Sequence, residues 1–180
     1  MVNLSLNFDH GAVPAASRAI KEEMNITNEL LGGLGSLVFL GIVCGSIFAT
    51  VIFNKYSYKC ILLCCYLGNA GGLILTAYTS NFRLLALSRF LTGFCQVFHC
   101  IYHPIFVDAF GTFKNKPILM STMLLAAPIG LITGYLITSK MSEWRYAFIL
   151  FGCNSLFNAT LFIFIPSQYI NIDLVFDLLE

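Results

Sequence analysis

Residues Leu30–Phe53, LLGGLGSLVFLGIVCGSIFATVIF, form a continuous apolar stretch without a charged side chain. Four more apolar stretches follow it, joined by short polar segments, at Cys60–Thr79, Leu84–Phe110, Pro117–Ser139 and Tyr146–Pro166. About 20 helical residues cross a hydrocarbon core of ~30 Å, so each stretch is long enough to span a bilayer. Backbone groups there have no water to bond, which forces each span to be helical. The sequence therefore predicts an all-α, multi-pass integral membrane protein.

The composition supports this class. The chain is 58% hydrophobic and 11% charged, with a mean hydropathy of +0.81, whereas soluble domains carry about 25% charged residues. This composition argues against a soluble enzyme, and we expect no catalytic residues and no cofactor. The net charge is +1, and the scattered Lys and Arg residues form no basic patch for nucleic acid. The bilayer is the expected partner, and the sequence does not indicate which membrane.

The chain before Leu30 differs from the five stretches. As a helix, residues 1–16 would cover at most ~24 Å, which is shorter than a bilayer, and they carry Asp9, His10 and Pro14. They lack the positive start of a signal peptide. We expect the outer half of a spanning helix whose beginning is absent, followed by a charged loop from Arg18 to Glu29. The resulting fold is a six-helix transmembrane bundle with a truncated first helix.

Small residues recur at a spacing that lets helices approach closely. Three pairs have this spacing, Gly41 with Gly45, Gly68 with Gly72, and Gly130 with Gly134. Three pairs on three helices favour a tightly packed bundle over separate anchors. Pro104 and Pro128 interrupt two of the predicted helices, and each proline frees a carbonyl and permits a bend.

The strongest functional signal is an arginine at membrane depth. An intramembrane Arg costs at least ~2.5 kcal/mol, so Arg89 must face a partner or a water-filled cavity. Asp9 is the one carboxylate expected at a similar depth. Their pair is either a structural ion pair or a device in which Asp9, or neighbouring His10, takes up a proton during transport. On the helix of Arg89, four residues share its face within about 80° at 100° per residue: Gly93, Gln96, Cys100 and His103.

Metal binding is disfavoured. His99 and His103 have the four-residue spacing of a two-histidine site, but no carboxylate completes it, because Asp108 lies well around the helix. The seven cysteines all fall within or at the ends of apolar stretches, without a Cys-x-x-Cys spacing, and packing is their expected role. We expect the two histidines to form hydrogen bonds across a cavity or to a neighbouring helix.

Several motifs together resemble the amino-terminal half of a major facilitator superfamily transporter, most similar to the spinster-like branch. They occur in order and in register from Leu6 to about Pro166. The matching segments are Asn7-Phe8-Asp9-His10, Leu87–Gly93 with its Arg-x-x-x-Gly motif, His103–Phe110, Ala127–Tyr135 with a Pro-x-Gly-x-x-x-Gly-Tyr pattern, and Glu143–Phe148. The resemblance implies that Asp9, His10 and Arg89 serve coupling and that Gln96, His99, Cys100 and His103 line the substrate cavity. It also implies packing or bending roles for Gly93, Pro128, Gly130 and Gly134.

Some positions depart from the family pattern. The family's signature Gly-x-Leu-x-Asp-Arg-x-Gly-Arg-Lys is replaced here by residues Thr50–Lys59, in which Asn54 stands for the Asp. The resemblance places Asn54, Lys55, Lys59 and Asp108 at a cytoplasmic gate, which the Asn weakens. Gln96 stands where spinster-like proteins have a Glu, which removes one protonatable site. His10 replaces an Arg.

Two functional hypotheses remain open. In the first, residues 1–166 form half of a secondary transporter that moves a small organic or lipid-like solute by alternating access. Such a half needs a second one, either a separate carboxy-terminal half or a second copy of the chain. In the second, the chain is a transporter-derived structural or regulatory membrane protein without transport. Residues 167–180 are expected to be a cytoplasmic tail or the start of an interdomain linker.

Overall fold

Helices make up nearly all of the part of the chain that the computed structural model describes, residues 2–167 and 170, and no strand occurs there. The five long apolar helices match the predicted stretches to within two residues at each end, and each is long and apolar enough to cross a membrane. The predicted all-α membrane bundle is therefore confirmed. The helices are α1 Val2–Leu6, α2 Phe8–Met24, α3 Asn28–Phe53, α4 Tyr58–Tyr78, α5 Phe82–Phe110, α6 Lys116–Lys140 and α7 Trp144–Phe164.

The first membrane helix differs from the prediction. It is broken at Asn7 into α1 and α2, and α2 then continues through the predicted charged loop as far as Met24. The loop prediction was wrong because this segment is alanine-rich and carries an Arg18–Glu22 pair one turn apart, at 2.8 Å. The helix ends at Asn25, which adopts the left-handed conformation at φ 50° and donates its N–H to Lys21 O.

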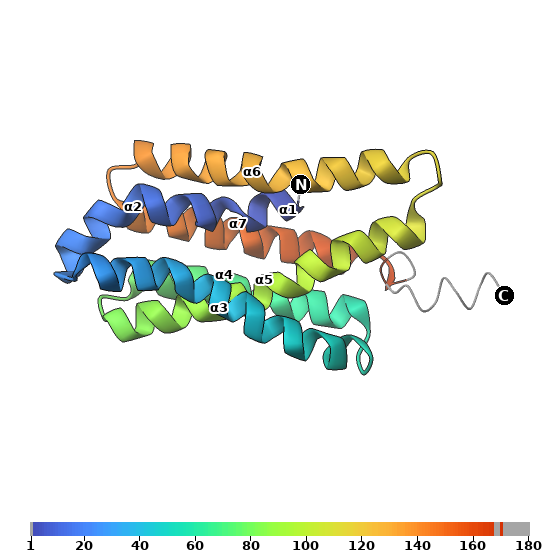
Figure 1. Cartoon of the computed structure of the whole chain (residues 1–180), viewed down its shortest axis with the longest axis horizontal. Helices are drawn as coiled ribbons and strands as arrows, with labels where there is room; N and C mark the ends of the chain where they lie inside the picture. Colours follow the sequence, from blue (N-terminus) through green and yellow to red (C-terminus); the bar gives the residue numbers. More distant parts are fainter. Residues whose placement is uncertain (1, 168–169, 171–180) are drawn as a thin grey trace.

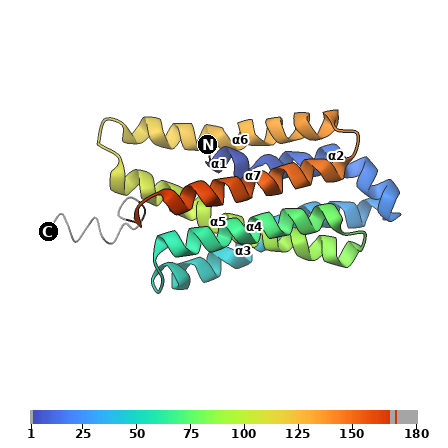
Figure 2. The same ribbon diagram turned by 180° about the vertical axis from the view of Figure 1, so that it is seen from behind.

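The long helices run up and down in an elongated bundle (Figures 1 and 2). The connections at residues 54–57 and 111–115 lie at one end, and those at residues 25–27, 79–81 and 141–143 lie at the other (Figure 1). Helix α2 packs chiefly on α6, α3 on α5, and α4 on both α5 and α7. Helix α1 begins about halfway along the bundle (Figure 1). The prediction for the tail falls mostly on residues 168–169 and 171–180, outside the described residues.

Glycines lie at the closest helix contacts. A Cβ added to Gly41 would meet the backbone of Phe90, and one added to Gly93 would meet the backbone of Val38, so α3 and α5 approach each other from both sides. Gly130 and Gly134 in α6 face the backbone of Leu4 and Phe8 in the same way. Because no side chain separates these backbones, the glycine positions set the distance between the paired helices.

We expect Gly134→Ala to destabilise the bundle. Its added methyl group would overlap Phe8 O, and overpacking of this kind costs about 1–3 kcal/mol. Thermal unfolding of the purified chain in detergent, followed by circular dichroism, measures the effect. The matched control is Gly71→Ala, whose Cβ would meet nothing within 4 Å and which should leave stability equal or slightly higher. Equal stability of both variants would contradict the close contact.

A polar cluster ties three helices together at the end of the bundle that holds residues 141–143. Glu23, at the end of α2, accepts hydrogen bonds from Trp144 Nε1 at 2.9 Å and from Arg145 Nε at 3.2 Å. Arg145 Nη1 also donates to the carbonyls of Ala77 and Thr79 at the end of α4. The hydrogen bond from Arg145 is the main cause that lowers the pKa of the Glu23 carboxyl.

This lowered pKa makes part of the stability depend on pH. The contribution of Glu23 is complete above the pKa of an unfolded Glu, about 4.3, and is lost as the pH falls through the lower folded value. We expect the melting temperature of Glu23→Gln to fall less than that of the natural chain between pH ~6 and pH ~3. Glu22→Gln, which removes an exposed carboxylate from the same helix, is the control. An unchanged pH slope in Glu23→Gln would refute the assignment.

Candidate functional site

The structure brings together the two charges for which the sequence predicted a pairing. Arg89 on α5 and Asp9 on α2 are each 1% exposed, and Arg89 Nη1 lies 3.5 Å from Asp9 Oδ2. The Arg89 guanidinium also lies over the ring of Phe148 on α7, with Cζ 4.6 Å from the ring centroid. Burial strengthens both the attraction within the pair and the cost of leaving either charge alone.

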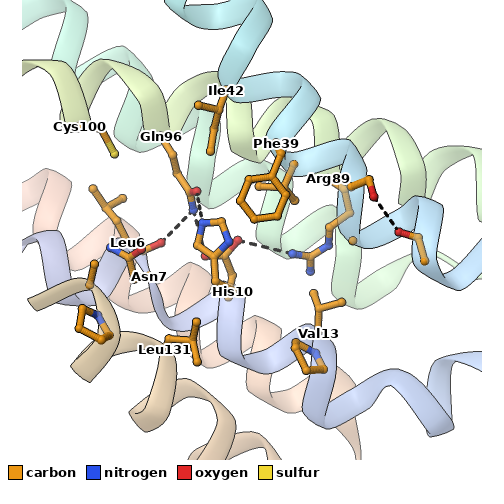
Figure 3. A pocket seen from close by; sticks show the side chains of 18 residues that line it. Leu6, Asn7, His10, Val13, Phe39, Ile42, Arg89, Gln96, Cys100 and Leu131 are labelled. Atoms are coloured by element: carbon orange, nitrogen blue, oxygen red, sulfur yellow. Dashed lines mark hydrogen bonds and ion pairs between the residues drawn. The ribbon is translucent and has the colours of Figure 1, made fainter.

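Gln96 joins this pair to α1 and to His10. Its Nε2 donates to Asp9 Oδ1 and to Leu6 O, each at 2.9 Å, and its Oε1 lies 2.9 Å from His10 Nε2 (Figure 3). An amide oxygen can only accept a hydrogen bond, so His10 donates to Oε1 through an N–H on Nε2. The neutral side-chain amide of Gln96 thus forms hydrogen bonds with both the Asp9 carboxylate and the His10 ring.

Sequence reasoning missed two members of this network. Gln96 Nε2 also approaches Asn69 Oδ1 on α4 at 3.5 Å, and Asn69 Nδ2 donates to Ser155 Oγ on α7 at 3.3 Å. Asn69 and Ser155 are buried polar residues within apolar helices. Their position among apolar residues in the sequence could have predicted this role, since a polar side chain at membrane depth needs a partner on another helix. The network therefore reaches α7 through α4.

A cavity of about 680 Å³ lies beside these side chains, and we call it the central cavity. Helices α1, α2, α3, α5 and α6 form its wall, and its polar lining includes Asp9, His10, Arg89, Gln96 and Cys100 (Figure 3). Most of the remaining wall is apolar. The central cavity thus combines an apolar wall with a few converging polar groups, as ligand sites commonly do.

The histidines predicted for the same cavity line a different one. His99 and His103 lie on a second cavity of about 470 Å³, together with Tyr66 and Tyr102. The four residues predicted to line the substrate cavity are thus divided between two cavities, with Gln96 and Cys100 on the central cavity and His99 and His103 on the second. Gln96 and His103 share a face of α5, but His103 lies two turns further along the helix, so it lines the second cavity instead. No cluster of three or more metal-binding side chains occurs among the described residues.

The four predicted gate residues lie toward the end of the bundle that holds residues 54–57. Asn54 caps α3, and Lys55 Nζ lies 5.7 Å from the ring centroid of Tyr56. Lys59 Nζ donates to the carbonyls of Ile163 at 3.1 Å and Ile165 at 2.6 Å, at the end of α7. Asp108 forms an ion pair with Lys116 across the connection between α5 and α6. Lys59 and Asp108 thus contact different neighbouring helices.

Fold and site together define a polytopic membrane protein with a buried ion pair on a cavity wall. The Major Facilitator Superfamily model matches residues 3–171, and the chain belongs to this superfamily. The chain is similar to the human "Solute carrier family 2, facilitated glucose transporter member 6", at 23% identity over 164 residues. It is also similar to an "Uncharacterized transporter" of Schizosaccharomyces pombe, at 27% identity over 165 residues.

These alignments cover most of the chain but a smaller part of each relative. They include 91% and 86% of this chain, and 32% and 31% of the human and yeast proteins. The chain therefore spans about a third of the length of the curated relatives that it matches. Both relatives are named as transporters.

We expect Gln96→Leu to destabilise the folded chain by about 1–3 kcal/mol, because it leaves buried partners on Asp9, Leu6 and His10 without their bonds. The free energy of unfolding in detergent measures the loss. Thr133→Val is the control, because the Thr133 hydroxyl is exposed and bonds only to Ile129 O in its own helix. A loss no larger than that of the control would argue against the network.

Proposed function

We propose that the chain forms half of a secondary transporter that moves a small organic or lipid-like solute by alternating access. The observation that supports this most is the position of the buried Asp9–Arg89 pair on the wall of the central cavity. A volume of about 680 Å³ lies within the range of small-molecule sites, roughly 300–1,000 Å³. Ionisable groups kept at membrane depth are costly, and they commonly mark solute or proton pathways.

Proton coupling is part of this proposal, with Asp9 and His10 as the groups that exchange the proton. Asp9 accepts hydrogen bonds from Arg89 and Gln96, and His10 donates to Gln96 in turn. A proton on Asp9 removes the charge that holds Arg89, so the guanidinium becomes free to bind another anion. A proton cycle of this kind therefore changes the contact between α2 and α5.

The full transport unit needs more than this one bundle. We propose that α3 and α6, which flank the central cavity and expose many apolar side chains, face a second half, either another copy or a separate carboxy-terminal half. Asn54, Lys55, Lys59 and Asp108 would form the cytoplasmic gate, and Pro128 would allow α6 to bend. The motifs around Asp9 and Arg89 support placement in the spinster-like branch.

Flux of unlabelled metabolites tests transport for many candidate solutes at once. Liposomes containing the purified chain are loaded with a metabolite extract, a pH gradient is imposed, and mass spectrometry identifies the solutes that leave. We expect at least one small organic solute to leave faster than from empty liposomes. Asp9→Asn and Arg89→Ala should remove most of that difference, because each breaks the buried pair.

Glu22→Gln, an exposed acid on the same helix as Asp9, is the matched control and should keep the flux. Light scattering of the same preparation measures how many chains form one unit. Release equal to that from empty liposomes would reject transport by this chain. It would then favour the structural or regulatory alternative.

A further inference from the structure

We propose that the central cavity selects organic anions and that Arg89 binds their carboxylate through Nε and Nη2. This inference rests on the proposed function for the location of the site. It adds the chemical class of the solute and the atoms that recognise it. The argument depends on the hydrogen-bond donors of one buried side chain.

Arg89 has more donors than its protein partners use. Nη1 reaches Asp9 Oδ2 at 3.5 Å, which is long for a charged hydrogen bond. Nε and Nη2 are buried and have no hydrogen-bond partner among the described residues. The second oxygen of Asp9, Oδ1, accepts from Gln96 rather than from these two donors. A fully buried guanidinium is thus left with one of its edges unsatisfied.

The unsatisfied edge has the geometry of an anion site. Nε and Nη2 lie side by side on the guanidinium plane, and their parallel N–H groups match the two oxygens of a carboxylate. Arg89 Cζ lies 4.6 Å from the ring centroid of Phe148, a cation–π contact that leaves these two N–H groups without an acceptor. An unpaired buried donor is unfavourable, and more so when it is charged. A bound carboxylate would remove that cost for both donors.

The rest of the central cavity indicates the body of the ligand. Apolar side chains form most of its wall, among them Val13, Val38, Phe39, Ile42 and Leu131. An apolar-bodied monocarboxylate therefore fits better than a sugar or a multiply charged anion. Nε and Nη2 are closed to solvent in this conformation, so binding requires the wall to shift. An alternating-access protein moves its cavity wall in every cycle.

Charge balance links the anion to a proton. The Asp9–Arg89 pair is neutral, so a bound carboxylate adds one negative charge to an apolar site. The titratable groups on the cavity wall are Asp9 and His10 on α2 and Arg89 and Cys100 on α5, and α3 and α6 add none to that wall. Of these, Asp9 and His10 can take up the compensating proton. Anion binding should therefore tighten as the pH falls.

The test compares two probes of nearly equal shape. Naphthoate carries the carboxylate, and naphthamide replaces it with a neutral amide. Binding to the purified full chain in phosphatidylcholine nanodiscs is measured by calorimetry and by saturation-transfer NMR. We expect naphthoate to bind at least about tenfold more tightly than naphthamide, since the charged two-point contact is lost in the amide.

Substitutions of Arg89 and Asp9 test which protein atoms bind the carboxylate. Arg89→Lys keeps the positive charge but lacks the paired donors, so naphthoate affinity should fall at least about tenfold. Arg83→Lys, on the exposed start of the same helix, is the matched control and should change nothing. Asp9→Asn keeps Arg89 and removes its competing carboxylate, so it should strengthen naphthoate binding. This second variant keeps the test decisive if Arg89→Lys does not fold.

Equal affinity for the acid and the amide, or no binding of either, would overturn the inference. So would unchanged naphthoate binding in both Arg89→Lys and Asp9→Asn. The binding measurement requires no flux, so it separates the two proposals. Anion binding without transport would reject the proposed function alone, whereas transport of neutral solutes without anion binding would reject only the inference.

Discussion

The burial of Arg89 beside Asp9 constrains how the central helix α5 lies against α2. A charge inside an apolar bundle is tolerated only when its partner sits at the same depth, so α5 must present Arg89 where α2 presents Asp9. Gln96, two turns further along α5, meets the other oxygen of Asp9 and the carbonyl of Leu6. These bonds fix both the rotation and the axial position of α5 against α2.

Hydropathy was enough to predict the five long helices, because length and apolar composition alone decide whether a segment spans a bilayer. It failed for the first helix. The continuation of α2 to Met24 depends on alanine propensity and the Arg18–Glu22 pair, which hydropathy does not register. The break at Asn7 also escaped prediction. Asn7 packs beside Gly130 of α6, a contact between segments that are distant in sequence.

The ion pair of the site could be predicted from the sequence, because Arg89 had a single candidate partner. Asp9 was the one carboxylate at suitable depth, so its pairing with Arg89 followed from charge alone. The roles of Phe148, Asn69 and Ser155 depend on how α4 and α7 rotate toward α5, and a single sequence does not contain that rotation. The same reason explains the position of His103. Its angle on α5 relative to Arg89 could be counted from the sequence, but the boundary between the two cavities could not.

The helix pairs suggest why the polar network matters for motion. Helices α2 and α6 form one closely packed pair, and α3 and α5 form another, with glycines at both contacts. The central cavity separates the two pairs, and Asp9, His10, Arg89 and Gln96 bridge them beside it. Rigid pairs joined by a few charged bonds move by changing those bonds rather than by repacking. A proton or an anion at this bridge therefore acts where the two pairs are held together.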